Sequence, residues 1–115
     1  MLHQRSTLCR LGRIQHDPEL FSALAETLRV PPYFGGNWDG LWDVIRDLSW
    51  IEAETIVLVH SELPRVPDSV LSLYLRILAE AVEDVRSNGH FELQVVFPAA
   101  LRAEVIAAID LLDNP

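Results

Sequence analysis

The sequence contains no lysine, and all nine of its basic residues are arginines. Its single cysteine, Cys9, cannot form an internal disulfide, which is typical of proteins in a reducing cytoplasm. No stretch approaches the roughly 18 to 20 consecutive apolar residues of a membrane span. The first residues also lack the apolar segment of a signal peptide. We therefore expect a cytoplasmic protein that does not enter a membrane.

Positive charge is scarce and unevenly distributed. The 17 acidic residues exceed the nine arginines by eight, which gives a net charge of −8. Residues 1–16 hold three arginines and no acid, so the remainder carries 17 acids against six arginines, or −11. The segment from Pro31 to Pro64 holds six acids and one base, Arg46. Such a field repels nucleic acid and attracts basic surfaces, although acidity can also serve solubility alone.

Half of the 115 residues are apolar, which is enough for one domain over residues 1–115. Apolar runs predict strands at about 7–11, 55–59 and 93–97, and helical spacing predicts helices at about 17–29, 38–48, 69–87 and 101–112. This alternation predicts an α/β fold in which helices pack on a mostly parallel sheet of three strands. The continuous apolar run Thr55–Val59 indicates a strand that is covered on both faces.

Local signals mark two of the helix ends. Asp17 followed by Pro18 predicts a helix that Asp17 caps and that begins at the proline. Asn88 and Gly89 predict the end of the longest helix.

Acidic residues crowd the last turns of that longest helix. Glu80, Glu83 and Asp84 lie near its C-terminal end, where negative charge is unfavourable for the helix dipole. Acids that are tolerated there without a local partner point weakly to an external partner.

Three side chains that could carry chemistry are better explained by packing. Cys9 has no His or Asn in a recognisable arrangement, so we expect a packed thiol rather than a nucleophile. His60 is expected to be a polar residue at a strand end, because the spacing of the other histidines forms no metal cluster with it. Tyr74 is expected in the core with its hydroxyl at the edge. The sequence thus predicts no catalytic residue, no metal site and no cofactor.

The most informative stretch has thirteen residues, starts at Tyr33 and reads YFGGNWDGLWDVI. Gly35 and Gly36 permit a tight turn that bulkier residues would resist. Asn37 is a good N-cap for a helix that begins at about Trp38. Both Tyr33 and Trp38 are large aromatics beside a turn that should be exposed, which favours a binding surface.

The helix after this turn separates apolar from acidic residues. Its buried face is expected to contain Leu41, Val44, Ile45 and Leu48. Asp39 and Asp43 are four residues apart, so they lie one above the other on a different face, and Asp47 continues the row. Trp42 lies between this row and the apolar face. The helix thus presents a row of carboxylates beside an aromatic ring.

This stretch resembles the signature of the barstar family of ribonuclease inhibitors, which reads Tyr-Tyr-Gly-x-Asn-x-Asp-Ala-Leu-Trp-Asp. Seven positions are identical: Tyr33, Gly35, Asn37, Asp39, Leu41, Trp42 and Asp43. A run of this length with fixed spacing is far more specific than a short motif. The order of the predicted elements also fits from about Thr7 to Phe97, which leaves residues 98–115 as a C-terminal helical extension.

The resemblance implies a protein that is not an enzyme, and that blocks the basic active site of a ribonuclease inside the cell as an immunity protein or antitoxin. The partner-binding residues that it implies are Tyr33, Gly35, Asn37, Asp39, Trp42, Asp43 and, by counting back from Gly89, Asp84. Trp38 joins this set as the aromatic beside the turn. The carboxylates would face arginines or lysines of the enzyme, and Tyr33 would lie against its catalytic histidine. The free chain is expected to be a monomer.

Three departures from the family pattern matter for the expected binding surface. Gly36 replaces an acid, and Asn88 replaces a carboxylate just before the helix-ending glycine. Leu48 stands where a contact aromatic is expected, with Trp50 as the alternative on another helix face. The acidic surface is therefore thinner, and the partner could be a different nuclease or a toxin of another kind.

Two other classes of function stay open. Carboxylates four residues apart could serve as an acid–base pair or as Mg²⁺ ligands, but no third ligand, nucleophile motif or obvious cleft accompanies them. A non-inhibitory interaction module would use the C-terminal helix as a dimer surface.

Overall fold

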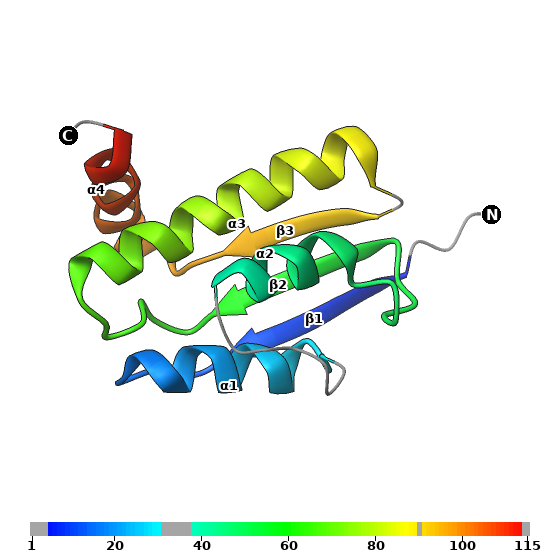
Figure 1. Cartoon of the computed structure of the whole chain (residues 1–115), viewed down its shortest axis with the longest axis horizontal. Helices are drawn as coiled ribbons and strands as arrows, with labels where there is room; N and C mark the ends of the chain where they lie inside the picture. Colours follow the sequence, from blue (N-terminus) through cyan, green and yellow to red (C-terminus); the bar gives the residue numbers. More distant parts are fainter. Residues whose placement is uncertain (1–4, 31–37, 90, 114–115) are drawn as a thin grey trace.

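The computed structural model describes residues 5–30, 38–89 and 91–113 (Figure 1). Its elements follow the predicted order: β1 (Ser6–Leu11), α1 (Asp17–Thr27), α2 (Trp38–Asp47), β2 (Thr55–His60), α3 (Asp68–Asn88), β3 (Glu92–Val96) and α4 (Arg102–Asp113), with a 3-10 turn at Ala99–Leu101. The predicted α/β fold is confirmed.

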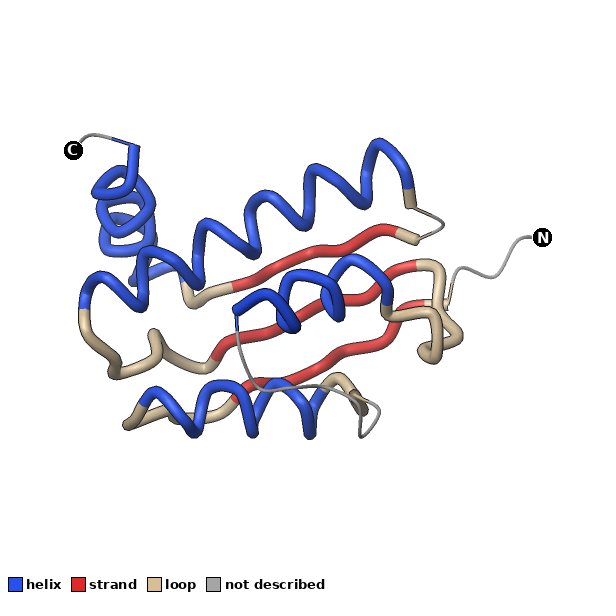
Figure 2. The backbone as a smooth tube through the Cα atoms, viewed as in Figure 1, coloured by secondary structure: helices blue, strands red, loops and turns tan. Residues whose placement is uncertain are grey.

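The three strands form one parallel sheet in the order β1-β2-β3. Leu8 of β1 is in register with Val57 of β2, which is in register with Gln94 of β3. Helices α1, α2 and α3 lie on the same side of this sheet (Figure 2). That arrangement follows from chain direction, because two right-handed crossovers that move the same way across a sheet place their helices on one face.

The described residues leave the opposite face of the sheet open, so the prediction of a strand covered on both faces is wrong. In β2 only every second residue is buried, and Val57 and Val59 are half-buried. On the flanking strands Leu8 is 56% exposed and Val96 is 41% exposed. The apolar run in β2 reflects a central position among the three strands rather than a second helix layer.

The core lies between the sheet and the three helices that cover it. Its largest fully buried aliphatic side chains come from every layer: Leu11, Leu20, Leu24, Leu28, Leu41, Ile45, Leu48, Ile56, Leu58 and Leu78. The predicted apolar face of α2 is therefore confirmed. Cys9 is also buried, as expected for a packed thiol, and burial raises the pKa of this thiol above its usual range.

The helix ends differ in part from the prediction. Helix α1 begins at Asp17, and His16 rather than Asp17 occupies the N-cap, without a side-chain cap hydrogen bond. At the end of α3 the backbone N–H of Gly89 donates to the carbonyl of Val85 at 2.8 Å. A Cβ on Gly89 would lie 2.7 Å from that carbonyl oxygen, so this close approach requires glycine.

The predicted C-terminal helix is present as α4. It packs against α3 near the carboxyl end of β3 (Figure 1). Ala108 of α4 is buried, whereas Ile106 remains 49% exposed.

Candidate functional site

Helix α2 displays the predicted acidic row at the protein surface. Burial of Leu41, Val44 and Ile45 against the core fixes the rotation of the helix. Asp39, Asp43 and Asp47 are consequently exposed, as their spacing predicted. Asp39 also lies in the first turn, where the helix dipole favours a negative charge.

An arginine connects this row to the neighbouring helix. Nη2 of Arg46 donates a hydrogen bond to Oδ1 of Asp43 at 3.1 Å. Nη1 of the same guanidinium forms an ion pair with Oδ2 of Asp84 on α3 at 3.8 Å. One planar cation thus joins two of the predicted partner-binding carboxylates, which come from different helices.

The two tryptophans of α2 have different surroundings. The guanidinium carbon of Arg46 lies 4.3 Å from the centroid of the Trp42 ring, which is within cation–π distance. Trp42 therefore belongs to the same surface cluster as the two carboxylates. Trp38 packs edge-to-face on Phe21 of α1, with ring centroids 4.9 Å apart, and is partly buried against the core. Its position ties α2 to α1.

The structure brings four of the predicted residues to one surface. We call Asp39, Trp42, Asp43, Asp84 and Arg46 the acidic cluster. Three other predicted residues, Tyr33, Gly35 and Asn37, lie outside the described residues, as does Gly36. Arg46 was not predicted as a site residue. Its position three residues after Asp43 was the available signal, because residues at that spacing meet on a helix surface.

The acids near the end of α3 have local partners. The inference of an external partner, which rested on the absence of local ones, was therefore wrong. Arg76 donates to Glu80 at 2.9 Å, and Arg86 donates to Glu83 at 3.5 Å. Asp84 is paired with Arg46. These arginines reduce the unfavourable interaction between the carboxylates and the helix dipole.

Leu48 stands where the family pattern expects a contact aromatic, and Trp50 was the alternative. Both residues stabilise the fold. Leu48 follows α2 in a left-handed conformation, with a φ of 42°, and is buried in the core. Trp50 lies beyond the end of α2, and its indole N–H donates to the carbonyl of Leu28 at 2.8 Å. The indole thereby satisfies a carbonyl at the end of α1.

His60 and Tyr74 form a buried polar pair. Nδ1 of His60 donates to the carbonyl of Val96 at 3.3 Å, so Nε2 accepts a hydrogen bond from the Tyr74 hydroxyl at 2.6 Å. The imidazole also stacks on Phe97 with ring centroids 4.0 Å apart. Tyr74 is a core residue as predicted, but its hydroxyl is buried rather than at the edge. Desolvation lowers the pKa of His60 to about 4.

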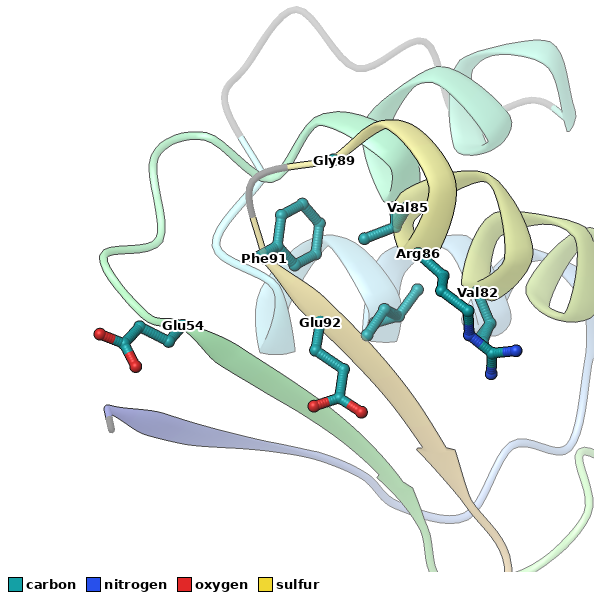
Figure 3. A pocket seen from close by; sticks show the side chains of 8 residues that line it. Glu54, Val82, Val85, Arg86, Gly89, Phe91 and Glu92 are labelled. Atoms are coloured by element: carbon teal, nitrogen blue, oxygen red, sulfur yellow. The ribbon is translucent and has the colours of Figure 1, made fainter. Parts of the chain in front are cut away.

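A separate hollow lies where α3 ends and β3 begins (Figure 3). It has a volume of about 370 Å³ and is lined by residues that include Glu54, Arg86, Phe91 and Glu92. Among residues 5–30, 38–89 and 91–113, no three His, Cys, Asp or Glu side chains are grouped to hold a metal ion. The residues that line this hollow include none of the predicted site residues, whereas Asp43 and Asp84 lie in the acidic cluster, which is the candidate site.

The fold and this surface define a class: a small α/β domain with one open-faced parallel sheet and an acidic helix on its covered side. The sequence matches the family Barstar (barnase inhibitor) over residues 4–98. The chain belongs to this family, whose members are inhibitors rather than enzymes. A search among curated proteins gave no match. Within the part of the chain that the structure describes, no helix is both long and apolar enough to cross a membrane.

Proposed function

We propose that this chain inhibits a ribonuclease by placing the carboxylates of α2 in the basic active site of that enzyme. The observation that carries this proposal is the exposed row Asp39, Asp43 and Asp47, on a helix inside the segment that matches the family. An active site that binds phosphates and stabilises their transition-state charge must be basic. Carboxylates on a rigid helix can occupy the positions that phosphates would take.

The charge of the whole chain supports the same proposal. A net charge of −8 attracts a basic enzyme before contact, and complementary fields accelerate association. Fast association matters where the target is toxic to the cell that makes it. We therefore propose an immunity or antitoxin role in the cytoplasm, with a free chain that is monomeric.

The remaining contacts are proposed from the family pattern. Tyr33, Gly35 and Asn37 precede α2 directly, so they would flank Asp39 at the start of the helix. Trp42 would add an aromatic surface beside Asp43, and Asp84 would extend the contact to α3. Trp38 would act mainly through its packing on Phe21, because it is partly buried.

The test compares two double variants that remove the same charge. Asp39→Ala/Asp43→Ala changes the acidic row, and the control Glu92→Ala/Glu104→Ala removes two exposed carboxylates on β3 and α4. The wild type and both variants serve as baits against extracts of the source cell and as inhibitors of any ribonuclease that they retain. The same three proteins are assayed against barnase, the enzyme named in the family description.

We expect the wild type and the control to retain and inhibit a basic ribonuclease, more weakly as salt rises, and the Asp39/Asp43 variant to lose both activities. Retention without inhibition would favour a non-inhibitory interaction module. A retained toxin without ribonuclease activity would redirect the proposal to that toxin. Equal behaviour of all three baits would exclude the acidic row as the binding surface.

One observation favours the interaction-module alternative. Apolar atoms line a hollow beside α4 between Phe97, Pro98, Val105 and Ile106, and Ile106 is 49% exposed. Helix α4 also lies beyond residues 4–98, so the family match does not account for it. A concentration-dependent homodimer that Ile106→Glu disrupts would support this second candidate.

A further inference from the structure

The acidic cluster already contains a cation. Arg46 holds Asp43 of α2 at 3.1 Å and Asp84 of α3 at 3.8 Å with the two amino groups of one guanidinium. The plane of a guanidinium suits this forked pairing, which a partner's arginine would also make. Arg46 therefore occupies the place between α2 and α3 where a basic partner would be expected to insert a cation.

The position of Arg46 is supported by packing as well as by charge. Its guanidinium lies over Trp42, and its side chain is only 34% exposed. Its Nε is buried and has no hydrogen-bond partner among the described residues. Trp42 and the two carboxylates thus hold a cation of this chain's own, although Asp43 remains 73% exposed and accessible from outside.

We propose that Arg46 is a resident counter-ion that competes with the cations of a partner for Asp43 and Asp84, and thereby determines which basic partners this surface accepts. The inference rests on the proposed function, since it concerns the same surface. A partner that places a guanidinium or ammonium group between α2 and α3 must share both carboxylates with Arg46 or displace it. Such a partner is disfavoured by repulsion from Arg46, which is a specificity element directed against it.

A partner that is accepted would approach differently. It would direct its cations to Asp39 and to the exposed side of Asp43, and it would leave the space over Arg46 without a positive charge. Arg46 thus lowers the number of partner cations that the surface can bind, and with it the salt dependence of binding.

The test uses Arg46→Gln, with Arg86→Gln as the matched control. Both changes remove one positive charge, but Arg86 pairs with Glu83 at 3.5 Å rather than with Asp43 or Asp84. The first probe is hexa-arginine, a ligand that does not depend on the identity of the natural partner. The second probe is barnase. Affinities and association rates are measured at low and moderate salt, after circular dichroism has shown that each variant is folded.

We expect Arg46→Gln to bind hexa-arginine about three- to tenfold more tightly than the wild type, and Arg86→Gln to gain at most about twofold. Adding Asp84→Asn to Arg46→Gln should remove most of the gain. Equal gains for the two arginine variants would show a general charge effect and overturn the proposal. Weaker binding by Arg46→Gln would also overturn it, because Arg46 would then orient the carboxylates rather than compete for them.

The two probes separate this inference from the proposed function. If barnase and every ribonuclease from the source cell are left uninhibited, the proposed function fails, and hexa-arginine still decides the role of Arg46. If inhibition is found but Arg46→Gln behaves like Arg86→Gln, the proposed function stands and the inference fails.

Discussion

Two of the polar contacts that helix α3 makes with neighbouring elements have sharply different surroundings. In its first half the Tyr74 hydroxyl donates to His60 of β2 at 2.6 Å, and both side chains are buried. Near its C-terminal end Asp84 pairs with Arg46 of α2 at 3.8 Å, and each of these two side chains is about one-third exposed. The first contact lies in the core, whereas the second lies at the surface.

This difference indicates separate roles for the two contacts. A buried polar group that loses its partner incurs its full desolvation cost. Removing either Tyr74 or His60 would therefore lower the stability of the protein. A surface ion pair contributes little, because water and salt replace it easily. The buried pair therefore fixes how α3 sits on the sheet, and the exposed pair remains available for a binding partner.

Substitutions in the buried Tyr74–His60 pair are expected to change the free energy of unfolding the most. Tyr74→Ala should lower the free energy of unfolding by about 3–5 kcal/mol, since it leaves a cavity and an unpartnered imidazole. Tyr74→Phe keeps the ring and removes only the hydroxyl, so a loss of about 1–3 kcal/mol is expected. Urea unfolding at neutral pH measures both. If Tyr74→Phe were as stable as the wild type, the hydrogen bond would contribute nothing and the contrast between the two contacts would disappear.

The second effect depends on pH. The pKa of His60 is lowered from 6.5 to about 4 in the folded protein, so between these values the unfolded chain binds a proton that the folded chain does not. The titration of His60 should consequently lower the free energy of unfolding by about 3 kcal/mol as the pH drops from 6.5 towards 4. Below pH 4 the same titration should cause no further change.

The control for this pH effect is His60→Gln, which keeps a polar side chain but cannot titrate. The wild-type unfolding free energy should fall more steeply than that of the variant over this range, because the titration of the carboxylates is common to both proteins. Parallel curves for the two proteins would mean that His60 does not limit acid stability.

The sequence predicted the architecture because each element depends on local information. Helical apolar spacing gave α2 and its buried residues Leu41 and Ile45, and the strand-helix alternation indicated a parallel sheet. The exposure of Asp39 and Asp43 followed from the same periodicity.

Features that depend on contacts between elements were not predictable. The pairing of Arg46 with Asp84 joins residues 38 positions apart, and the bond between His60 and Tyr74 depends on how α3 crosses β2. The left-handed conformation of Leu48 has no glycine to signal it, and burial of its side chain offsets the backbone cost. The crossover direction decides which face of the sheet the helices cover, and a run of apolar residues does not indicate that direction.

Substitutions in the exposed Arg46–Asp84 pair are expected to change the free energy of unfolding the least. Arg46→Gln and Asp84→Asn should each change the free energy of unfolding by less than about 1 kcal/mol, because water replaces the lost contact. A double-mutant cycle at low salt should give a coupling of about 0.2–1 kcal/mol, which decreases at high salt. A coupling as large as the loss in Tyr74→Phe would make the Arg46–Asp84 pair a structural contact. Arg46 could not then move aside for a partner, and a gain in binding after Arg46→Gln would need another explanation.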